Sequence, residues 1–246
     1  MKRRRKASLA ARIMPFWIFA IVLVALIGWG GAWLAQSTWF RVTRVGVDVP
    51  LASPVSPDSV RAAAGISRET NVWLIDTRGA ARRIEAIPYV DRATIHRGQF
   101  PKPFVELAVT VRRPTACVRG GGRDVTIDAT ARVLQAGCAP AALPRFDAGA
   151  AAVAAPGGTV ADPEVARLLA DAKTLGDANL AVRRLARDRF GGLTAVDVTG
   201  VTIQFGTDDD LAKKAALVEP VRKGVSNRTI RAIDLRAPGT PVVVFR

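Results

Sequence analysis

The residue types that most often carry catalysis or bind metals are scarce in this chain of 246 residues. It contains one histidine, His96, and two cysteines, Cys117 and Cys138. A zinc site, a Cys–His nucleophile or a histidine-based triad needs more of these residues than the chain offers. We therefore predict no catalytic residue, no metal site, no bound cofactor and no small-molecule substrate.

Two further motifs favour ordinary structural roles. Asp208-Asp209-Asp210 could suggest a cation site, but consecutive acids at the start of a helix more often interact with the helix dipole and with water. Gly120-Gly121-Gly122 is flanked by predicted strands and is not followed by the Lys-Ser/Thr pair of a phosphate loop. We interpret the first motif as a helix start and the second as a turn.

The two cysteines leave two alternatives open. In an oxidising space outside the membrane, Cys117 and Cys138 could form a disulfide. They lie at the start of a predicted three-strand meander and just beyond its end. The outer strands of a meander are about 10 Å apart, which is too far for a disulfide unless a chain end curls back.

The N-terminal region combines basic charge with a long apolar run. The formal net charge is +15, and six basic residues precede residue 13 without an acid: Lys2, Arg3, Arg4, Arg5, Lys6 and Arg12. Residues 13–40 contain no charged side chain. As a helix, residues 14–35 would extend roughly 33 Å, enough to cross a hydrocarbon core of about 30 Å. Aromatic residues lie at both ends of this run, as is typical of a membrane-spanning helix.

These features predict a single-pass membrane protein of type II. We expect residues 1–12 to form a cytoplasmic basic tail that contacts anionic lipid, and residues 13–37 to form the transmembrane helix. The remaining residues would lie outside the cytoplasm. The rival interpretation is a cleaved signal peptide, but its apolar core is usually about 7–15 residues long. The bulky Trp33, two residues before Ala35, is also poor for cleavage.

Residues 38–113 show a β-α-α-β-β pattern. Ser56, followed by Pro57, predicts the start of a short helix that ends at Gly65. Asp76 predicts the cap of a second helix, which Pro88 ends. The predicted strands are residues 40–49, 89–97 and 104–112, the second helix is residues 77–87, and a turn is expected at residues 98–102.

Residues 114–246 predict a second region of mixed α and β structure. It opens with a meander of three short strands, and residues 139–159 are interpreted as a loop rich in Ala, Gly and Pro. The predicted strands are residues 116–119, 124–128, 132–135, 181–188, 194–198, 201–205, 230–235 and 242–245. The predicted helices are residues 162–175, which stop at Gly176, and residues 209–223. The fold class is therefore α+β.

Several motifs of these two regions belong to a known pattern. They are Phe40-Arg41-Val42, Val55-Ser56, Ala64-Gly65-Ile66, Asn71-Val72-Trp73-Leu74-Ile75-Asp76, Ile87-Pro88-Tyr89-Val90, Phe100-Pro101, Arg112-Arg113-Pro114 and Ile127-Asp128. The first region resembles a POTRA domain in its order of elements and in these residues. With one membrane helix before it, and with Leu143-Pro144-Arg145-Phe146 and Ile233-Asp234-Leu235-Arg236 after it, the chain is similar to the FtsQ family of bacterial division proteins, called DivIB in some lineages.

The resemblance implies a scaffold of the division complex, located in the inner membrane at the septum. Members of the family join two small single-pass partners, FtsB and FtsL, and help regulate septal peptidoglycan synthesis. A partner adds a strand to an exposed edge of the C-terminal β domain, since an edge strand has unpaired backbone groups. The matching residues here are Ile230, Ala232, Asp234, Val242, Val243, Val244 and Phe245. Membrane lipids are expected partners as well, and nucleic acid is not.

Two other functions compete with this hypothesis. A POTRA-bearing component of protein secretion or outer-membrane assembly usually continues into a barrel of many strands. The roughly 110 residues that follow the POTRA-like part, with two predicted helices, cannot form such a barrel. An anchored cell-wall enzyme would need a Ser-x-x-Lys motif, a metal cluster or paired carboxylates, and the sequence offers none of these constellations.

Overall fold

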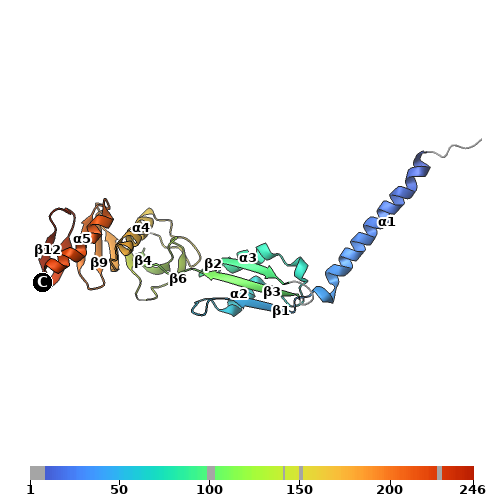
Figure 1. Cartoon of the computed structure of the whole chain (residues 1–246), viewed down its shortest axis with the longest axis horizontal. Coiled ribbons are helices and arrows are strands. Elements are labelled where there is room, and N and C mark those ends of the chain that lie inside the picture. The colour runs from blue at the N-terminus through green and yellow to red at the C-terminus, as the bar shows by residue number, and fades with distance from the viewer. Residues whose placement is uncertain (1–8, 99–102, 141, 150–151, 226–228) are drawn as a thin grey trace, which may run out of the picture. The chain divides into compact units, whose positions relative to one another are not determined.

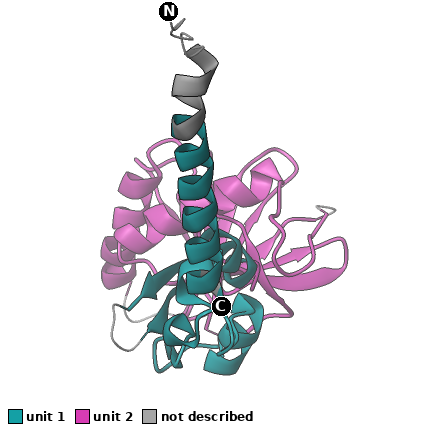
Figure 2. Cartoon of the chain, turned by 90° about the vertical axis from the view of Figure 1, so that its right-hand side faces the viewer, with its two compact units in different colours: residues 1–85, 92–110 teal, residues 86–91, 111–246 magenta. Residues whose placement is uncertain are grey.

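The computed structural model describes residues 9–98, 103–140, 142–149, 152–225 and 229–246. The basic residues from Lys2 to Lys6, the Phe100-Pro101 motif and most of the predicted turn at residues 98–102 lie outside the described residues. The chain divides into two compact units (Figure 2). The first unit comprises residues 1–85 and 92–110, and the second comprises residues 86–91 and 111–246.

The first element is a long apolar helix, α1 (Leu9–Gln36), drawn in blue in Figure 1. Its stretch Phe16–Leu34 is long and apolar enough to cross a membrane, and none of it is buried by the rest of the protein. At about 1.5 Å per residue this stretch extends roughly 28 Å, close to the thickness of the hydrocarbon core. Lipid is the environment that suits such a surface, so α1 is the transmembrane helix that the sequence predicts.

The first unit contains a three-stranded sheet in the order β1-β3-β2. The strands are β1 (Arg44–Asp48), β2 (Val90–Arg97) and β3 (Phe104–Val111). β1 runs parallel to β3. The hydrogen bonds from Gly98 N to Phe104 O and from Arg112 N to Tyr89 O, both 2.8 Å, indicate that β2 and β3 are antiparallel.

Two helices and a 3₁₀ turn complete this unit: α2 (Pro57–Ala64), η2 (Val72–Leu74) and α3 (Thr77–Glu85). The predicted caps are present, because Ser56 Oγ accepts a hydrogen bond from Ser59 N at 3.1 Å and Gly65 has a φ of 63°. Asp76 Oδ1 accepts from Gly79 N at 2.9 Å at the start of α3. The buried apolar residues of this unit include Val60, Ala64, Ala80, Ile84, Val105 and Leu107. The unit therefore has the predicted β-α-α-β-β order.

The predicted strand at residues 40–49 is wrong in its first part. Thr38–Phe40 forms a 3₁₀ turn, η1, whose cap Ser37 accepts a hydrogen bond from Trp39 N at 3.3 Å. β1 begins only at Arg44. A serine cap directly after an apolar helix turns the chain locally, and this competes with the alternating pattern that suggested a longer strand.

The second unit contains a sheet of nine strands among the described residues, in the order β12-β11-β10-β9-β8-β7-β4-β5-β6. The strands are β4 (Ala116–Gly120), β5 (Arg123–Ile127), β6 (Val133–Ala136), β7 (Arg145–Asp147), β8 (Val182–Arg187), β9 (Leu193–Asp197), β10 (Thr202–Gly206), β11 (Ile230–Asp234) and β12 (Val242–Phe245). β7 runs parallel to both β4 and β8, and β10 runs parallel to β11. The other pairs are antiparallel.

Helices α4 (Pro163–Asp177) and α5 (Leu211–Gly224) pack on one face of this sheet. Side chains in register across the strands meet them in one core, which includes Val118, Phe146, Leu185, Ala195, Ile203 and Ile233 from the sheet and Val165, Leu168, Leu211 and Ala215 from the helices. Because side chains alternate along a strand, the next residues point to the opposite face. That face is partly exposed, with Arg145, Arg184 and Val244 on it.

Three expectations for the second unit are corrected. Residues 145–147 form β7 within the predicted loop, because Phe146 is buried between neighbouring strands. Helix α4 continues through Gly176, and Asn179 takes the left-handed conformation after it, with a φ of 59°. Helix α5 begins at Leu211 rather than residue 209, since Asp210 is itself left-handed, with a φ of 55°.

Candidate functional site

The C-terminal strand β12 is the outermost strand of the nine-stranded sheet, and β11 is its neighbour. The pairs Ala232↔Val244, Ile233↔Val243 and Asp234↔Val242 set the register, and it shifts between Ile230 and Ala232. Such a shift is a β-bulge, a common feature near sheet edges. The seven residues predicted to bind a partner therefore lie together on the last two strands of this sheet.

The backbone of β12 alternates between its neighbour and the open edge. Arg246 N donates to Thr229 O at 3.0 Å, so the backbone groups of residue 246 point toward β11. Successive residues of a strand point their backbone groups in opposite directions. Those of Val244 and Val242 therefore point to β11 as well, and those of Val243 point away, toward the open edge.

The side chains of β12 present an apolar surface on the partly exposed face of the sheet. Val242 is 57% exposed and Val244 is 45% exposed, while Val243 and Phe245 are half-buried. Val243 is in register with the buried Ile233 and so points to the side of the sheet that carries the helices. An added strand would thus meet apolar side chains from one face and backbone groups from the edge.

The predicted partner-binding residues of β11 contribute more to the fold than those of β12 do. Ile230 packs against the core of the unit, and the carboxylate of Asp234 accepts hydrogen bonds from the Arg236 guanidinium, the shortest 2.6 Å. This ion pair lowers the pKa of Asp234, which therefore stays charged at neutral pH. The β11 strand, with Ile230, Ala232 and Asp234, pairs with the inner edge of β12. Val242 and Val244 are the more exposed of the residues predicted to bind a partner.

A hollow of about 340 Å³ adjoins the end of this edge. It is lined by Thr199, Val201, Arg222, Val225, Thr229, Ile230 and Arg246. Thr229 and Ile230 begin β11, and Arg246 follows β12, so the hollow lies where the edge strand ends. The sequence did not indicate it, because its residues come from four separate segments of the chain.

Comparison with known proteins agrees with this architecture. The family model described as "POTRA domain, FtsQ-type" matches residues 47–112. The chain is also 30% identical over 253 aligned residues to the Cell division protein FtsQ of Streptomyces venezuelae, a match that covers 97% of this chain and 86% of the relative. The chain belongs to the FtsQ family. It is therefore a membrane protein with an FtsQ-type POTRA domain and a role in cell division.

Four residues of the FtsQ-like motifs, which are Tyr89, Val90, Arg112 and Asp128, make polar contacts in the second unit. The Arg112 guanidinium contacts Asp128 Oδ2 at 2.7 Å, Asp91 Oδ1 at 3.0 Å and Val90 O at 3.0 Å. Tyr89 donates its hydroxyl proton to Gln135 Oε1 at 2.6 Å. Burial opposes the ionisation of Asp128, but its hydrogen bonds from Arg112, Thr130 and Arg132 outweigh this and lower its pKa. These motif residues thus hold the segment 86–91 to the second unit.

The structure also brings together the cysteine pair of this FtsQ-family protein. Cys117 in β4 and Cys138 after β6 are joined as a disulfide, with their Cα atoms 5.3 Å apart. The chain curls back after β6, where Thr126 Oγ1 donates to Gly137 O at 2.8 Å and accepts from Ala139 N at 3.2 Å. Cys138 thereby reaches across β5 to β4. A chain end that curls back in this way is what a disulfide between the outer strands of the meander requires.

We predict that the reduced protein is less stable than the oxidised one. A disulfide that closes a loop of 21 residues restricts the unfolded chain by about 3 kcal/mol. The Cys138→Ser variant should show the same loss in urea unfolding as wild type treated with a reductant, and the reductant should have no further effect on the variant. An unchanged midpoint in both cases would show that the two thiols are not bridged.

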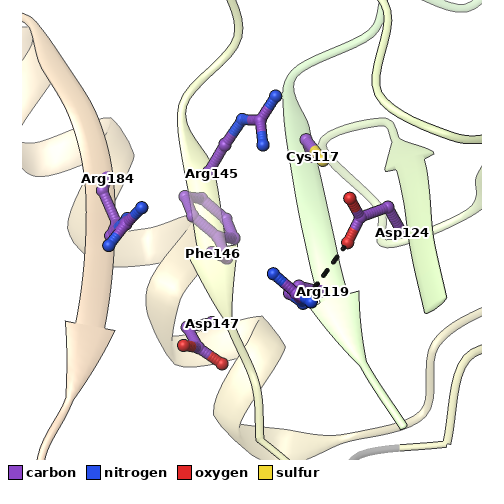
Figure 3. A pocket seen from close by; sticks show the side chains of 7 residues that line it. All are labelled: Cys117, Arg119, Asp124, Arg145, Phe146, Asp147 and Arg184. Atoms are coloured by element: carbon purple, nitrogen blue, oxygen red, sulfur yellow. Dashed lines mark ion pairs between the residues drawn. The ribbon is translucent and has the colours of Figure 1, made fainter. Parts of the chain in front are cut away.

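A small pocket next to this disulfide holds arginines that sequence reasoning missed (Figure 3). It measures about 100 Å³ and is lined by Cys117, Arg119, Asp124, Arg145, Phe146, Asp147 and Arg184. Arg145 and Arg184 are direct neighbours on the parallel strands β7 and β8. Arg119 lies 3.9 Å from Asp124, whereas neither Arg145 nor Arg184 has an ion-pair partner among the described residues. Free guanidinium groups favour a small anionic group on this face.

The acidic motif and the histidine have ordinary surroundings. Asp208 accepts a hydrogen bond from Arg187 at 3.0 Å, and Asp210 pairs with Lys213 at 2.8 Å. These contacts lower the pKa of both carboxyl groups. His96 is an exposed residue of β2. In the part of the chain that the structure describes, no group of three or more His, Cys, Asp or Glu residues is placed to hold a metal ion.

Proposed function

We propose that this FtsQ-family protein is a non-enzymatic scaffold of the division complex that binds its partners by strand addition to β12. The observation that carries the proposal is the position of β12 at the end of the nine-stranded sheet, with the backbone N–H and C=O of Val243 directed toward the open edge. An extended segment can pair with such an edge through backbone hydrogen bonds, and the exposed Val242 and Val244 side chains offer apolar contacts.

The partners that fit this mode are FtsB-like and FtsL-like proteins, which are small and single-pass. Through them the chain would recruit and regulate septal peptidoglycan synthesis. The six basic residues before residue 13 favour a cytoplasmic N-terminus, so the POTRA domain and the second unit would lie outside the cytoplasm, where septal wall is made. The membership of this chain in the FtsQ family of cell-division proteins supports this role.

The sharpest test is a pair of substitutions at Val243. Val243→Pro removes the outward N–H while the pairs of Val242 and Val244 with β11 remain, and proline is tolerated on an edge strand. Val243→Ala keeps the N–H and is the matched control. We expect the full chain to lose co-purification with an FtsB-like partner, at least about tenfold, in the proline variant only, because the edge loses the outward donor of residue 243 and the proline ring occupies the place where the added strand would pair.

Both variants must retain the wild-type melting temperature for the comparison to be valid. Equal partner binding by Val243→Pro and wild type would overturn strand addition at β12. Equal loss in both variants would instead point to side-chain recognition at residue 243, with the backbone playing no part.

A further inference from the structure

A short segment of the POTRA domain lies next to the end of the transmembrane helix. Asn71 Nδ2 donates to Leu34 O at 3.2 Å, and Leu34 is the last residue of the apolar stretch of α1. Arg41 forms a bridge with Asn71, and Val42 N donates to Thr70 O at 3.1 Å. These contacts place residues 70–74 at the level where the hydrocarbon core gives way to the lipid headgroups.

Two large apolar side chains of this segment point outward. Trp73 is 64% exposed and Leu74 is 65% exposed, although their neighbours Val72 and Ile75 are buried in the POTRA core. Isolated exposed apolar residues are common on protein surfaces. Here, however, a tryptophan and a leucine are adjacent in a segment that contacts the end of the membrane-spanning stretch, which is the depth of the membrane interface.

The conformation that exposes them is fixed by hydrogen bonds. Asn71 Oδ1 accepts from Trp73 N at 2.9 Å, and Leu74 N donates to Asn71 O at 3.0 Å, which together form η2. The Arg97 guanidinium lies 3.5 Å from Trp73 O and 3.4 Å from Ile75 O. The segment is thus held from both sides, and the outward direction of its two apolar side chains is part of the fold.

The surroundings match a lipid surface better than a protein surface. Trp33 and Trp39, at the end of α1 and in η1, are both exposed as well and belong to the aromatic belt of the membrane helix. Arg41 and Arg44 are exposed nearby and have no ion-pair partner among the described residues. Aromatic rings at headgroup depth with cations around them are the usual composition of a membrane-contacting surface.

We propose that η2 is a second membrane contact, in which Trp73 and Leu74 insert into the headgroup region of the bilayer that α1 crosses. The POTRA domain is then held against the membrane at two places, the end of α1 and η2. Two contacts restrict the tilt of the domain relative to the bilayer, which a single flexible attachment would leave free. This inference does not depend on the identity of the division partners or on which side of the membrane the domain occupies.

The test uses the full chain in phosphatidylcholine and phosphatidylglycerol vesicles, with Trp17, Trp29, Trp33 and Trp39 replaced by Phe so that Trp73 is the only tryptophan. Its fluorescence is measured with lipids brominated near the headgroup end of the acyl chain, and with iodide in the aqueous phase. We expect bromine to remove most of the Trp73 emission and iodide to have little effect. The matched control carries Trp73→Phe and Leu51→Trp, since Leu51 is fully exposed in the turn after β1, at the end of that strand away from α1. Its emission should respond to iodide and not to bromine.

A second probe keeps the proposal testable if the variant with four Trp→Phe substitutions folds poorly. In the otherwise wild-type chain, Trp73→Phe should remove a bromine-quenchable part of the total emission, whereas Phe190→Trp should add emission that iodide quenches. Trp73 emission that behaves like that of Leu51→Trp overturns the proposal. Protection from iodide without bromine quenching also overturns it, because that result indicates a protein contact at η2.

Discussion

Replacing Arg187 with Ala should lower the free energy of unfolding of the second unit by about 4 kcal/mol, because it leaves a buried carboxylate without its cation. Arg187 is 7% exposed and lies at the end of β8. Its guanidinium contacts Asp171 of α4 at 2.6 Å, Asp208 before α5 at 3.0 Å and Gly191 O at 2.9 Å. One side chain therefore connects the sheet to the segments that carry both helices.

The deficit of this variant should depend on pH in a defined direction. Burial raises the pKa of Asp171 above its ordinary value of 3.8, although Arg187 opposes this effect. Without Arg187 the folded-state pKa rises further. A raised pKa in the folded state contributes stability that is present below the unfolded value and is lost as pH rises through the folded value. The free energy of unfolding of the variant should therefore be close to that of wild type in acid, and the difference between them should grow toward neutral pH.

Urea unfolding of the full chain in detergent, followed by circular dichroism, measures this effect. Arg184→Ala is the matched control, because Arg184 is on the same strand but exposed and should change stability by less than about 0.5 kcal/mol. The double variant Arg187→Met with Asp171→Leu should recover much of the loss, since an apolar pair needs no charge compensation. A loss that is the same at every pH would contradict the role given to Asp171.

Replacing Asp197 with Ala should lower the free energy of unfolding of the second unit by about 3 kcal/mol, because several donors lose one buried acceptor at once. Asp197 is 1% exposed and is the last residue of β9. Its carboxylate accepts from Thr199 N at 2.9 Å, from the Thr199 hydroxyl at 2.8 Å and from Val201 N at 2.8 Å. It also pairs with Arg222 of α5. The same carboxylate thus closes the β9–β10 turn and attaches a helix to it.

The pH dependence of this second effect has the opposite sign. Burial alone would raise the pKa of Asp197, but the hydrogen bonds from Thr199, Val201 and Arg222 outweigh it and lower the pKa below 3.8. A lowered pKa contributes stability that is present above the unfolded value and is lost as pH falls through the folded value. The difference between wild type and Asp197→Ala should therefore be full at neutral pH and shrink below 3.8.

Asp188→Ala is a close control for Asp197→Ala. Asp188 caps the β8–β9 turn in the same way, accepting from Phe190 N and Gly192 N at 2.8 Å, but it is exposed. Its loss should destabilise the protein much less than the loss of Asp197, since water replaces the missing acceptor. If Asp188→Ala and Asp197→Ala destabilise the protein equally, burial and the Arg222 pair contribute nothing.

Short-range features were the ones that sequence reasoning placed correctly. The Ser56 cap, Pro57 and the left-handed Gly65 frame α2 as predicted, because a cap needs only residues three or four positions away. The same reasoning failed at Gly176. A glycine inside a helix costs only about 1 kcal/mol, and the apolar contacts of α4 with the sheet exceed that, so the helix continues to Asp177.

The candidate site was predictable in part. The residues of β11 and β12 were found through a family resemblance and through their alternating pattern, but their position at the end of a sheet was not derivable from spacing. That position depends on β10 and β11 being joined by α5 as a parallel pair, with β12 added last. The pairing of Arg145 in β7 with Arg184 in β8 could not be predicted from the sequence, because these residues become neighbours only when both strands join one sheet.

The sequence by itself determined the membrane helix, the order of elements in the POTRA domain and the scarcity of histidine and cysteine. Each of these follows from composition or from interactions between residues close together in the chain. Only the tertiary structure decided which strand is outermost, that the chain curls back to bring Cys138 to Cys117, and that Asn71, next to the segment with Trp73 and Leu74, contacts Leu34. Such contacts join residues far apart in sequence, and their formation depends on the whole core offsetting the entropy of loop closure.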